Sequence, residues 1–136
     1  MELVVTSLDH LVLNVSDVEV SAAWYQRVLG MRREDFTPAG SSSARTSVKF
    51  GKQKINLRPA SASPDAWLTA RSVATGSADL CFLSTSVPDE VVAHLHALDI
   101  PIEKGPVERT GAQGTLLSVY CRDPDGNLIE IASYTT

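Results

Sequence analysis

The chain has 136 residues, 43% of them hydrophobic and 21% charged, and a net charge of −4. This length suits a single domain, which we expect to span residues 1–136. No apolar run approaches the roughly 18 residues that a membrane-spanning helix needs. The basic residues are dispersed and form no positively charged patch of the kind that binds nucleic acid. We therefore expect a soluble protein that binds neither nucleic acid nor a membrane.

The start of the chain and its cysteines bear on location. Residues 1–10 lack the basic segment and the apolar stretch of a signal peptide. Cys81 and Cys121 each lie in an apolar, strand-like run, which favours buried and reduced thiols. Together these features predict a cytoplasmic protein.

The first half of the chain predicts a strand, a helix and three further strands. Residues 7–15 are rich in β-forming residues and predict a strand. Ser16 and Glu19 have the spacing of a capping box, so a helix should follow, and Gly30 can adopt the left-handed conformation that ends it. Short strands then fit about residues 31–36, 44–50 and 53–58.

The same order recurs after a connector rich in Ser, Ala and Pro at residues 59–77. A strand at 78–83 precedes a helix opened by the run Ser86–Asp89, in which Pro88 suits the first turn. The remaining strands fit about residues 101–104, 115–121 and 127–134. The chain is therefore predicted to be a duplication, with modules at about residues 5–58 and 78–136.

Alternation within the strands separates a polar face from the aliphatic face that should meet each helix. Successive strand side chains point to opposite faces of a sheet. His10 and Asn56 then share the polar face in the first and last strands of one half, and Asp79 and Glu130 occupy it in the other half. We expect these polar groups to face one concavity.

Several stretches of the chain carry a resemblance to a known superfamily. Leu8–Leu13, Trp24–Met31 and Asp123–Glu130 resemble the vicinal-oxygen-chelate superfamily of glyoxalases, bleomycin-resistance proteins and extradiol dioxygenases. Within it, residues 51–57 and 76–81 are similar to the branch called glyoxalase domain-containing protein 5. The resemblance implies an α+β fold in which two βαβββ modules form a cupped, eight-stranded mixed sheet around a ligand cavity.

The resemblance also implies a divalent metal site. Members of the superfamily hold the ion through His, Glu or Gln on the inner face, and these ligands carry over to His10 and Glu130. Asp79 stands where a second His is common, and Asn56 where Glu or Gln is common. The expected metal ligands are therefore His10, Asp79 and Glu130, and the expected ion is Ni, Mn, Fe, Zn or Co, with Asp79 shifting the preference toward harder ions.

Structural roles compete with these interpretations. A lone strand histidine is commonly a hydrogen-bonded structural residue, and Glu130 could be an ion-paired carboxylate. Asn56 is a poor metal ligand and suits hydrogen bonding, including contact with a substrate. Arg58 could reach a substrate carboxylate through a bidentate contact.

Different classes of function remain open from the sequence. The first is a divalent-metal-dependent lyase or isomerase of a small oxygenated molecule, with Glu130 as ligand or proton carrier. The second is an extradiol-type dioxygenase, which Asp79 in place of histidine disfavours. The third is a metal-free protein that sequesters a drug or toxin. We also expect a homodimer that buries the connector with Trp67.

Overall fold

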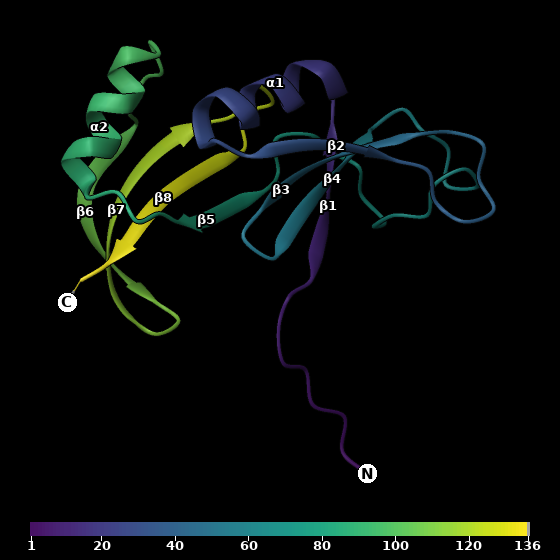
Figure 1. Ribbon diagram of the computed structural model, residues 1–136, viewed down its shortest axis with the longest axis horizontal. Helices are drawn as coiled ribbons and strands as arrows, with labels where there is room; N and C mark the ends of the chain where they lie inside the picture. The colour runs from purple at the N-terminus through teal and green to yellow at the C-terminus, as the bar shows by residue number, and fades with distance from the viewer. Residues whose placement is uncertain (136) are drawn as a thin grey trace. The chain divides into compact units, whose positions relative to one another are not determined.

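The structure, a computed structural model, describes residues 1–135 as two compact units, which divide after Ala74 (Figure 1). Both units have the order βαβββ, which confirms the predicted α+β fold and duplication. The first unit contains β1 (His10–Val15), α1 (Val18–Leu29), β2 (Arg32–Phe36), β3 (Arg45–Phe50) and β4 (Gln53–Pro59). The second contains β5 (Asp79–Leu83), α2 (Pro88–Ala97), β6 (Lys104–Gly111), β7 (Gly114–Arg122) and β8 (Leu128–Tyr134).

The strands form a four-stranded mixed sheet in each unit. The strand orders are β1-β4-β3-β2 and β5-β8-β7-β6, with the first and last strands of each unit pairing in parallel. Asn56 lies beside Val12, two residues after the start of β1, and Glu130 lies beside Cys81, two residues after the start of β5. Asn56 and Glu130 therefore hold equivalent positions in the two sheets, as the duplication predicts.

One face of each sheet is covered by the helix of its own unit. Helix α1 packs on β2, β3 and β4, and helix α2 packs on β6, β7 and β8. The helix-facing strand residues are aliphatic and buried, as strand alternation predicted. They include Leu13, Val15, Ile55 and Leu57 in the first unit and Val119, Ile129 and Ile131 in the second.

The start of helix α1 differs in detail from the prediction. Asp17, not Ser16, is the N-cap, and its carboxylate accepts a hydrogen bond from the Val20 backbone N–H. The Glu19 carboxylate forms a bidentate ion pair with Arg33 at the start of β2, at 2.6 and 2.9 Å, so the capping box was wrong. Gly30 ends the helix in the left-handed conformation, as predicted.

The second strand of the second unit was also placed wrongly. The sequence predicted residues 101–104, whereas β6 runs from Lys104 to Gly111. Strand β6 pairs only with β7, so it is an edge strand, and an edge can hold Pro106 because no neighbour needs its missing N–H. The register shifts between Lys104 and Val107, which marks a bulge.

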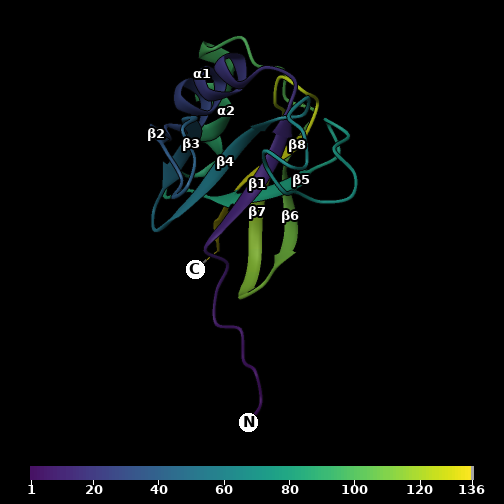
Figure 2. The same cartoon turned by 90° about the vertical axis from the view of Figure 1, so that its right-hand side faces the viewer.

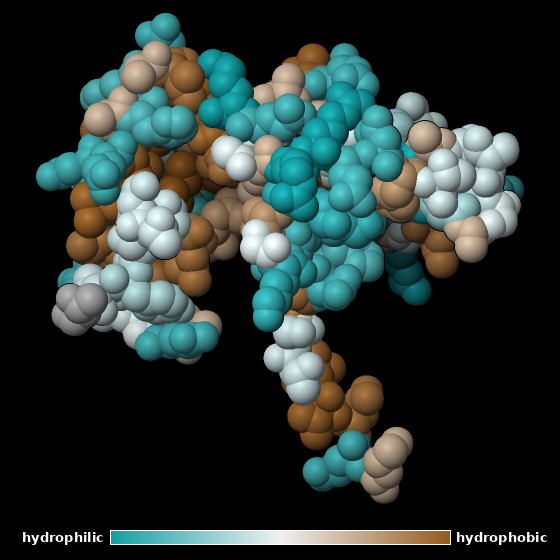
Figure 3. All heavy atoms as spheres, viewed as in Figure 1, coloured by the Kyte–Doolittle hydropathy of each residue, from teal (hydrophilic) through white to brown (hydrophobic). Residues whose placement is uncertain are grey.

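Residues 1–9 have no secondary structure and extend away from β1 (Figure 2). Leu3, Val4 and Val5 are exposed in this segment, and the space-filling view shows its apolar surface (Figure 3). No helix within residues 1–135 combines the length and the apolar character needed to cross a membrane.

Gly76, at the start of the second unit, is closely packed, and Gly40 of the first unit provides a comparison. Gly76 has φ +76°, and a Cβ there would collide with the Asp125 carbonyl oxygen, whereas Gly40 has φ +78° and open space around it. We expect Gly40→Ala to lower the free energy of unfolding by about 1 kcal/mol, from backbone strain alone. Gly76→Ala should cost about 2–4 kcal/mol because backbone must also move. Urea unfolding measures both, and equal losses would contradict the close contact.

Candidate functional site

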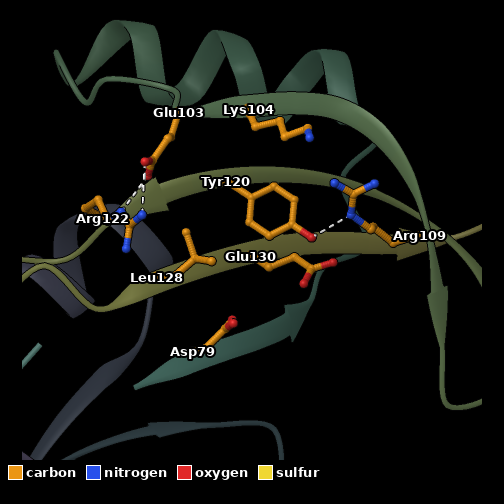
Figure 4. Close-up of a pocket in the computed structure, with 8 residues that line it drawn as sticks. All are labelled: Asp79, Glu103, Lys104, Arg109, Tyr120, Arg122, Leu128 and Glu130. Carbon is orange, nitrogen blue, oxygen red and sulfur yellow. Dashed lines mark hydrogen bonds and ion pairs between the residues drawn. The ribbon is translucent and has the colours of Figure 1, made fainter. Parts of the chain in front are cut away.

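The helix-free face of the second sheet holds a cavity of about 380 Å³ (Figure 4). Its volume lies within the range of small-molecule pockets. Its walls come from all four strands of the sheet and from the residue just before β6. The lining residues are Asp79, Glu103, Lys104, Arg109, Tyr120, Arg122, Leu128 and Glu130.

A buried turn fixes the two carboxylates that the sequence predicted for this face. The Asp123 carboxylate accepts hydrogen bonds from the Asn127 backbone N–H at 2.9 Å and from its side-chain Nδ2 at 2.7 Å. The Asn127 side-chain oxygen in turn accepts from the Ala78 N–H at 2.9 Å. This chain of bonds ties the starts of β5 and β8 together, which brings Asp79 and Glu130 to one cavity.

Glu130 is held in place by a serine that was not predicted from the sequence. The buried Ser118 hydroxyl donates a hydrogen bond to Glu130 Oε2 at 2.6 Å. A short hydrogen bond to a carboxylate fixes its orientation. Ser118 could have been found by alternation, because it shares the polar face of β7 with Tyr120.

The charged pair at one end of the cavity is self-neutralised. Arg122 forms a bidentate ion pair with Glu103, at 2.5 and 3.0 Å (Figure 4). Hydrogen bonding to Arg122 lowers the pKa of Glu103, and the same bond raises the pKa of Arg122. This pair therefore closes the end of the cavity without offering a net charge to a ligand.

The β6 side of the cavity is basic, and its basic residues were not predicted from the sequence. Arg109 Nε donates to the Tyr120 hydroxyl at 3.0 Å, and the guanidinium carbon lies 5.5 Å from the centroid of that ring. Lys104 pairs with Tyr120 across the sheet and lines the same cavity. Its ammonium group makes no hydrogen bond or ion pair with any of residues 1–135.

Cys81 lies beside Glu130 and corrects a prediction. Cys121 is buried, but Cys81 is exposed on the helix-free side of β5, and both are free thiols. Desolvation of the Cys81 thiol, followed by the charge of Glu130 and a hydrogen bond to it, raises its pKa to about 11.

The thiol of Cys81 therefore reports on the carboxylate of Glu130. We expect Glu130→Gln to lower the pKa of Cys81, because it removes a negative charge that disfavours the thiolate. Alkylation of Cys81 by iodoacetamide near pH 9 should become about two- to fivefold faster. Peptide mass spectrometry follows Cys81 with the buried Cys121 as internal control. An unchanged rate would show that Glu130 does not act on this thiol.

In the first unit, His10 has the hydrogen bonding of a potential metal ligand. Its Nδ1 lies 2.8 Å from the Asp9 carboxylate, and its side chain is 44% exposed. In the tautomer that donates from Nδ1, the Nε2 atom keeps a lone pair. Metal-binding histidines commonly have this arrangement, in which the ring N–H that does not face the metal donates to a carboxylate. His10 belongs to the first unit and does not line the cavity of the second.

Asn56 contains an unusual buried atom. Its side chain is only 7% exposed, and its Oδ1 accepts no hydrogen bond within residues 1–135. A buried polar oxygen without a partner is costly, so it is a candidate acceptor for a ligand donor or a cation. The substrate-contacting role expected of Asn56 stays a prediction, and the same oxygen is of a type that can bind a metal.

Arg58 has a structural role in place of the expected substrate contact. Its side chain is fully buried and donates to the Asn14 side chain at 2.8 Å. Its other hydrogen bonds go to backbone carbonyls of the connector, namely those of Pro59, Ala62, Ser63 and Trp67. Arg58 therefore fastens the connector onto the first sheet and presents no exposed donor to a ligand.

The donor types suit a divalent ion, although the described residues contain no assembled cluster. An oriented imidazole, two carboxylates and an orphaned amide oxygen are ligands that first-row divalent metals accept. Across residues 1–135, no group of three or more His, Cys, Asp and Glu side chains is close enough to hold an ion.

Comparison with known proteins agrees with this architecture. The model of the glyoxalase/bleomycin resistance protein/dioxygenase superfamily matches residues 7–131. A virulence protein of Salmonella typhimurium is 41% identical over 98% of this chain and 88% of its own length. A glyoxalase domain-containing protein of Mycosarcoma maydis is 41% identical, over 98% of this chain and 71% of its own. The structure of an integron cassette protein from the mobile metagenome of V. cholerae superposes with a TM-score of 0.90 at 42% identity, covering 99% of this chain and all of that one.

With the duplicated βαβββ order, two four-stranded mixed sheets and a family match over most of its length, the chain belongs to the glyoxalase/bleomycin resistance protein/dioxygenase superfamily.

Proposed function

We propose that the protein is a divalent-metal-dependent lyase or isomerase of a small oxygenated molecule, in which Glu130 is the catalytic carboxylate. The observation that carries this proposal is the arrangement of the second unit's cavity. Glu130 is oriented there by Ser118 and shares the cavity with Asp79 and with the hydroxyl of Tyr120. The proposed metal ligands are His10, Asp79 and Glu130.

Each residue has a part that follows from its contacts. Ser118 occupies Glu130 Oε2 and holds the carboxylate toward the cavity, where it can accept a proton from a carbon or hydroxyl next to a carbonyl. Tyr120 accepts a hydrogen bond from Arg109, so its own hydroxyl proton is available to a substrate oxygen. A bound divalent ion would supply a positive charge that stabilises negative charge on neighbouring substrate oxygens.

A second candidate is a metal-free protein that binds a small molecule. The observation in its favour is that the His, Cys, Asp and Glu side chains of residues 1–135 form no ready cluster for an ion. A half-open cavity with cations at one side and carboxylates at the other can bind a polar compound without catalysis. The extradiol dioxygenase has less support, because Asp79 leaves His10 as the one imidazole among the proposed ligands.

Metal titration separates these functions. Protein purified without a histidine tag is stripped with chelator and titrated calorimetrically with Ni²⁺, Mn²⁺, Zn²⁺, Co²⁺ and, without oxygen, Fe²⁺. We expect stoichiometric binding of at least one ion. His10→Ala and Glu130→Ala should each weaken it by about 10–100-fold or more, because each removes a ligand.

Glu108→Ala is the matched control for this titration. Glu108 is an exposed carboxylate of β6 that does not line the cavity, so its loss should leave metal affinity unchanged. No binding by the unaltered protein would overturn the enzyme proposal and favour the binding protein. Binding that neither His10→Ala nor Glu130→Ala weakens would overturn the ligand assignment.

We also propose a cytoplasmic homodimer, although not through the surface that the sequence suggested. Trp67 was expected at a dimer interface, but it is buried in its own unit, where the Arg45 guanidinium stacks 3.9 Å from its ring centroid. Light scattering at micromolar concentration tests the dimer, and a monomer at all concentrations would overturn it.

A further inference from the structure

The basic side of the second unit's cavity has an uncompensated charge. Four charged residues lie at its two sides: Lys104 and Arg109 on β6, and Asp79 and Glu130 on β5 and β8. Glu103 and Arg122 neutralise each other. Neither Lys104 nor Arg109 forms an ion pair within the described chain, residues 1–135.

The basic groups are separated from the carboxylates by Tyr120. The cross-strand pairs Lys104–Tyr120 and Tyr120–Glu130 form one row across the sheet. Figure 4 shows the Tyr120 ring between Lys104 and Glu130, with the Arg109 side chain reaching the hydroxyl of the ring. A ligand lying along this row would meet cations at one end and carboxylates at the other.

The donors at the basic end are prepared for an oxygen anion. Arg109 is held by its Nε bond to Tyr120 and by an NH1 bond to the Glu108 carbonyl oxygen, while its NH2 group makes no bond within residues 1–135. A guanidinium that is already positioned loses little freedom when it binds a carboxylate or phosphate. The Lys104 ammonium and the Tyr120 hydroxyl proton add further donors.

The exposed position of Lys104 on an edge strand also has a simpler explanation. Lysines on edge strands commonly discourage pairing with other sheets by pointing into water. Lys104 is exposed but also lines the cavity, beside the bulge that shifts the register of β6 before Val107. Bulges of this kind re-aim side chains and are frequent beside binding sites.

We infer that Lys104, Arg109 and Tyr120 form an anion subsite, so that the ligand of this cavity is a small organic anion. Its carboxylate or phosphoryl group lies against these three residues, and its oxygenated carbon points toward Glu130. The inference rests on the proposed function for the end that reacts, whereas the anion subsite itself requires neither metal nor catalysis.

The test is a titration of the ¹⁵N-labelled full chain with malonate and, separately, with inorganic phosphate, in EDTA and at constant ionic strength. We expect saturable chemical-shift changes at Lys104, Arg109 and Tyr120, including the Arg109 Nε–H signal. The malonate and phosphate arms show which oxyanion is preferred. Shifts that chloride reproduces at equal ionic strength would overturn the subsite.

Variants identify the donors. Lys104→Gln should weaken the preferred anion at least threefold, and it is the cleanest change because Lys104 has no partner to leave unpaired within residues 1–135. Arg109→Gln and Tyr120→Phe should also weaken it, and Lys52→Gln, an exposed cation of the first unit, should not. Unchanged affinity in both Lys104→Gln and Arg109→Gln would overturn the inference. EDTA excludes metal here, so this failure leaves the outcome of the metal titration intact.

Discussion

Replacing Arg58 with methionine is expected to lower the free energy of unfolding by about 3–5 kcal/mol, because it removes one partner from a buried charged network. The fully buried guanidinium donates to the Asn14 side chain and to connector carbonyls, including that of Trp67 at 3.0 and 3.2 Å. Methionine has a similar length but no donor, so these oxygens would stay buried without partners. Urea unfolding measures the loss.

The control for this variant is Arg71→Met. Arg71 is exposed and makes no hydrogen bond or ion pair within residues 1–135, so its replacement should change stability by less than about 0.5 kcal/mol. Arg58→Lys should fall between the two, because an ammonium keeps the charge but cannot reproduce the fork of guanidinium donors. A stable Arg58→Met protein would restore Arg58 as a candidate for binding a substrate.

The elements that depend on local pattern were predicted well. Alternation and duplication predicted the strands at His10 and Asp79 and the polar faces with Asn56 and Glu130. Capping predicted the helix that ends at Gly30. These features arise from neighbouring residues, and a periodic pattern encodes them directly. Alternation alone therefore places Asp79 and Glu130 on the sheet face that forms the cavity.

The contacts that depend on tertiary structure were not predictable. Strand β6 contains Gly105 and Pro106, which disfavour a strand unless it lies at an edge, and edge position is decided by the whole sheet. Arg58 looked available to a substrate because nothing local shows that the connector folds over it. The partnership of Arg109 with Tyr120 crosses from one strand to another in a register that a bulge has shifted.

Asp79 offers the sharpest test of the metal proposal, because the resemblance implies a histidine at this position and this chain has a carboxylate. Asp79 is exposed at the start of β5, and its side chain makes no hydrogen bond or ion pair within residues 1–135. Its replacement should therefore change the free energy of unfolding by less than about 1 kcal/mol. Any effect on metal affinity can then be assigned to the ligand and not to misfolding.

Asp79→His is expected to raise the affinity for Zn²⁺ and Ni²⁺ by about 10–100-fold, because imidazole suits these borderline ions better than a carboxylate does. Asp79→Ala should lower the affinity for every ion that binds. Asp89→His, on the exposed first turn of α2, shows what a new surface histidine contributes by itself. Calorimetric titration of the chelator-stripped variants gives the affinities. If Asp79→His and Asp89→His raise the metal affinities equally, Asp79 is not a ligand. Its carboxylate then only lines the cavity.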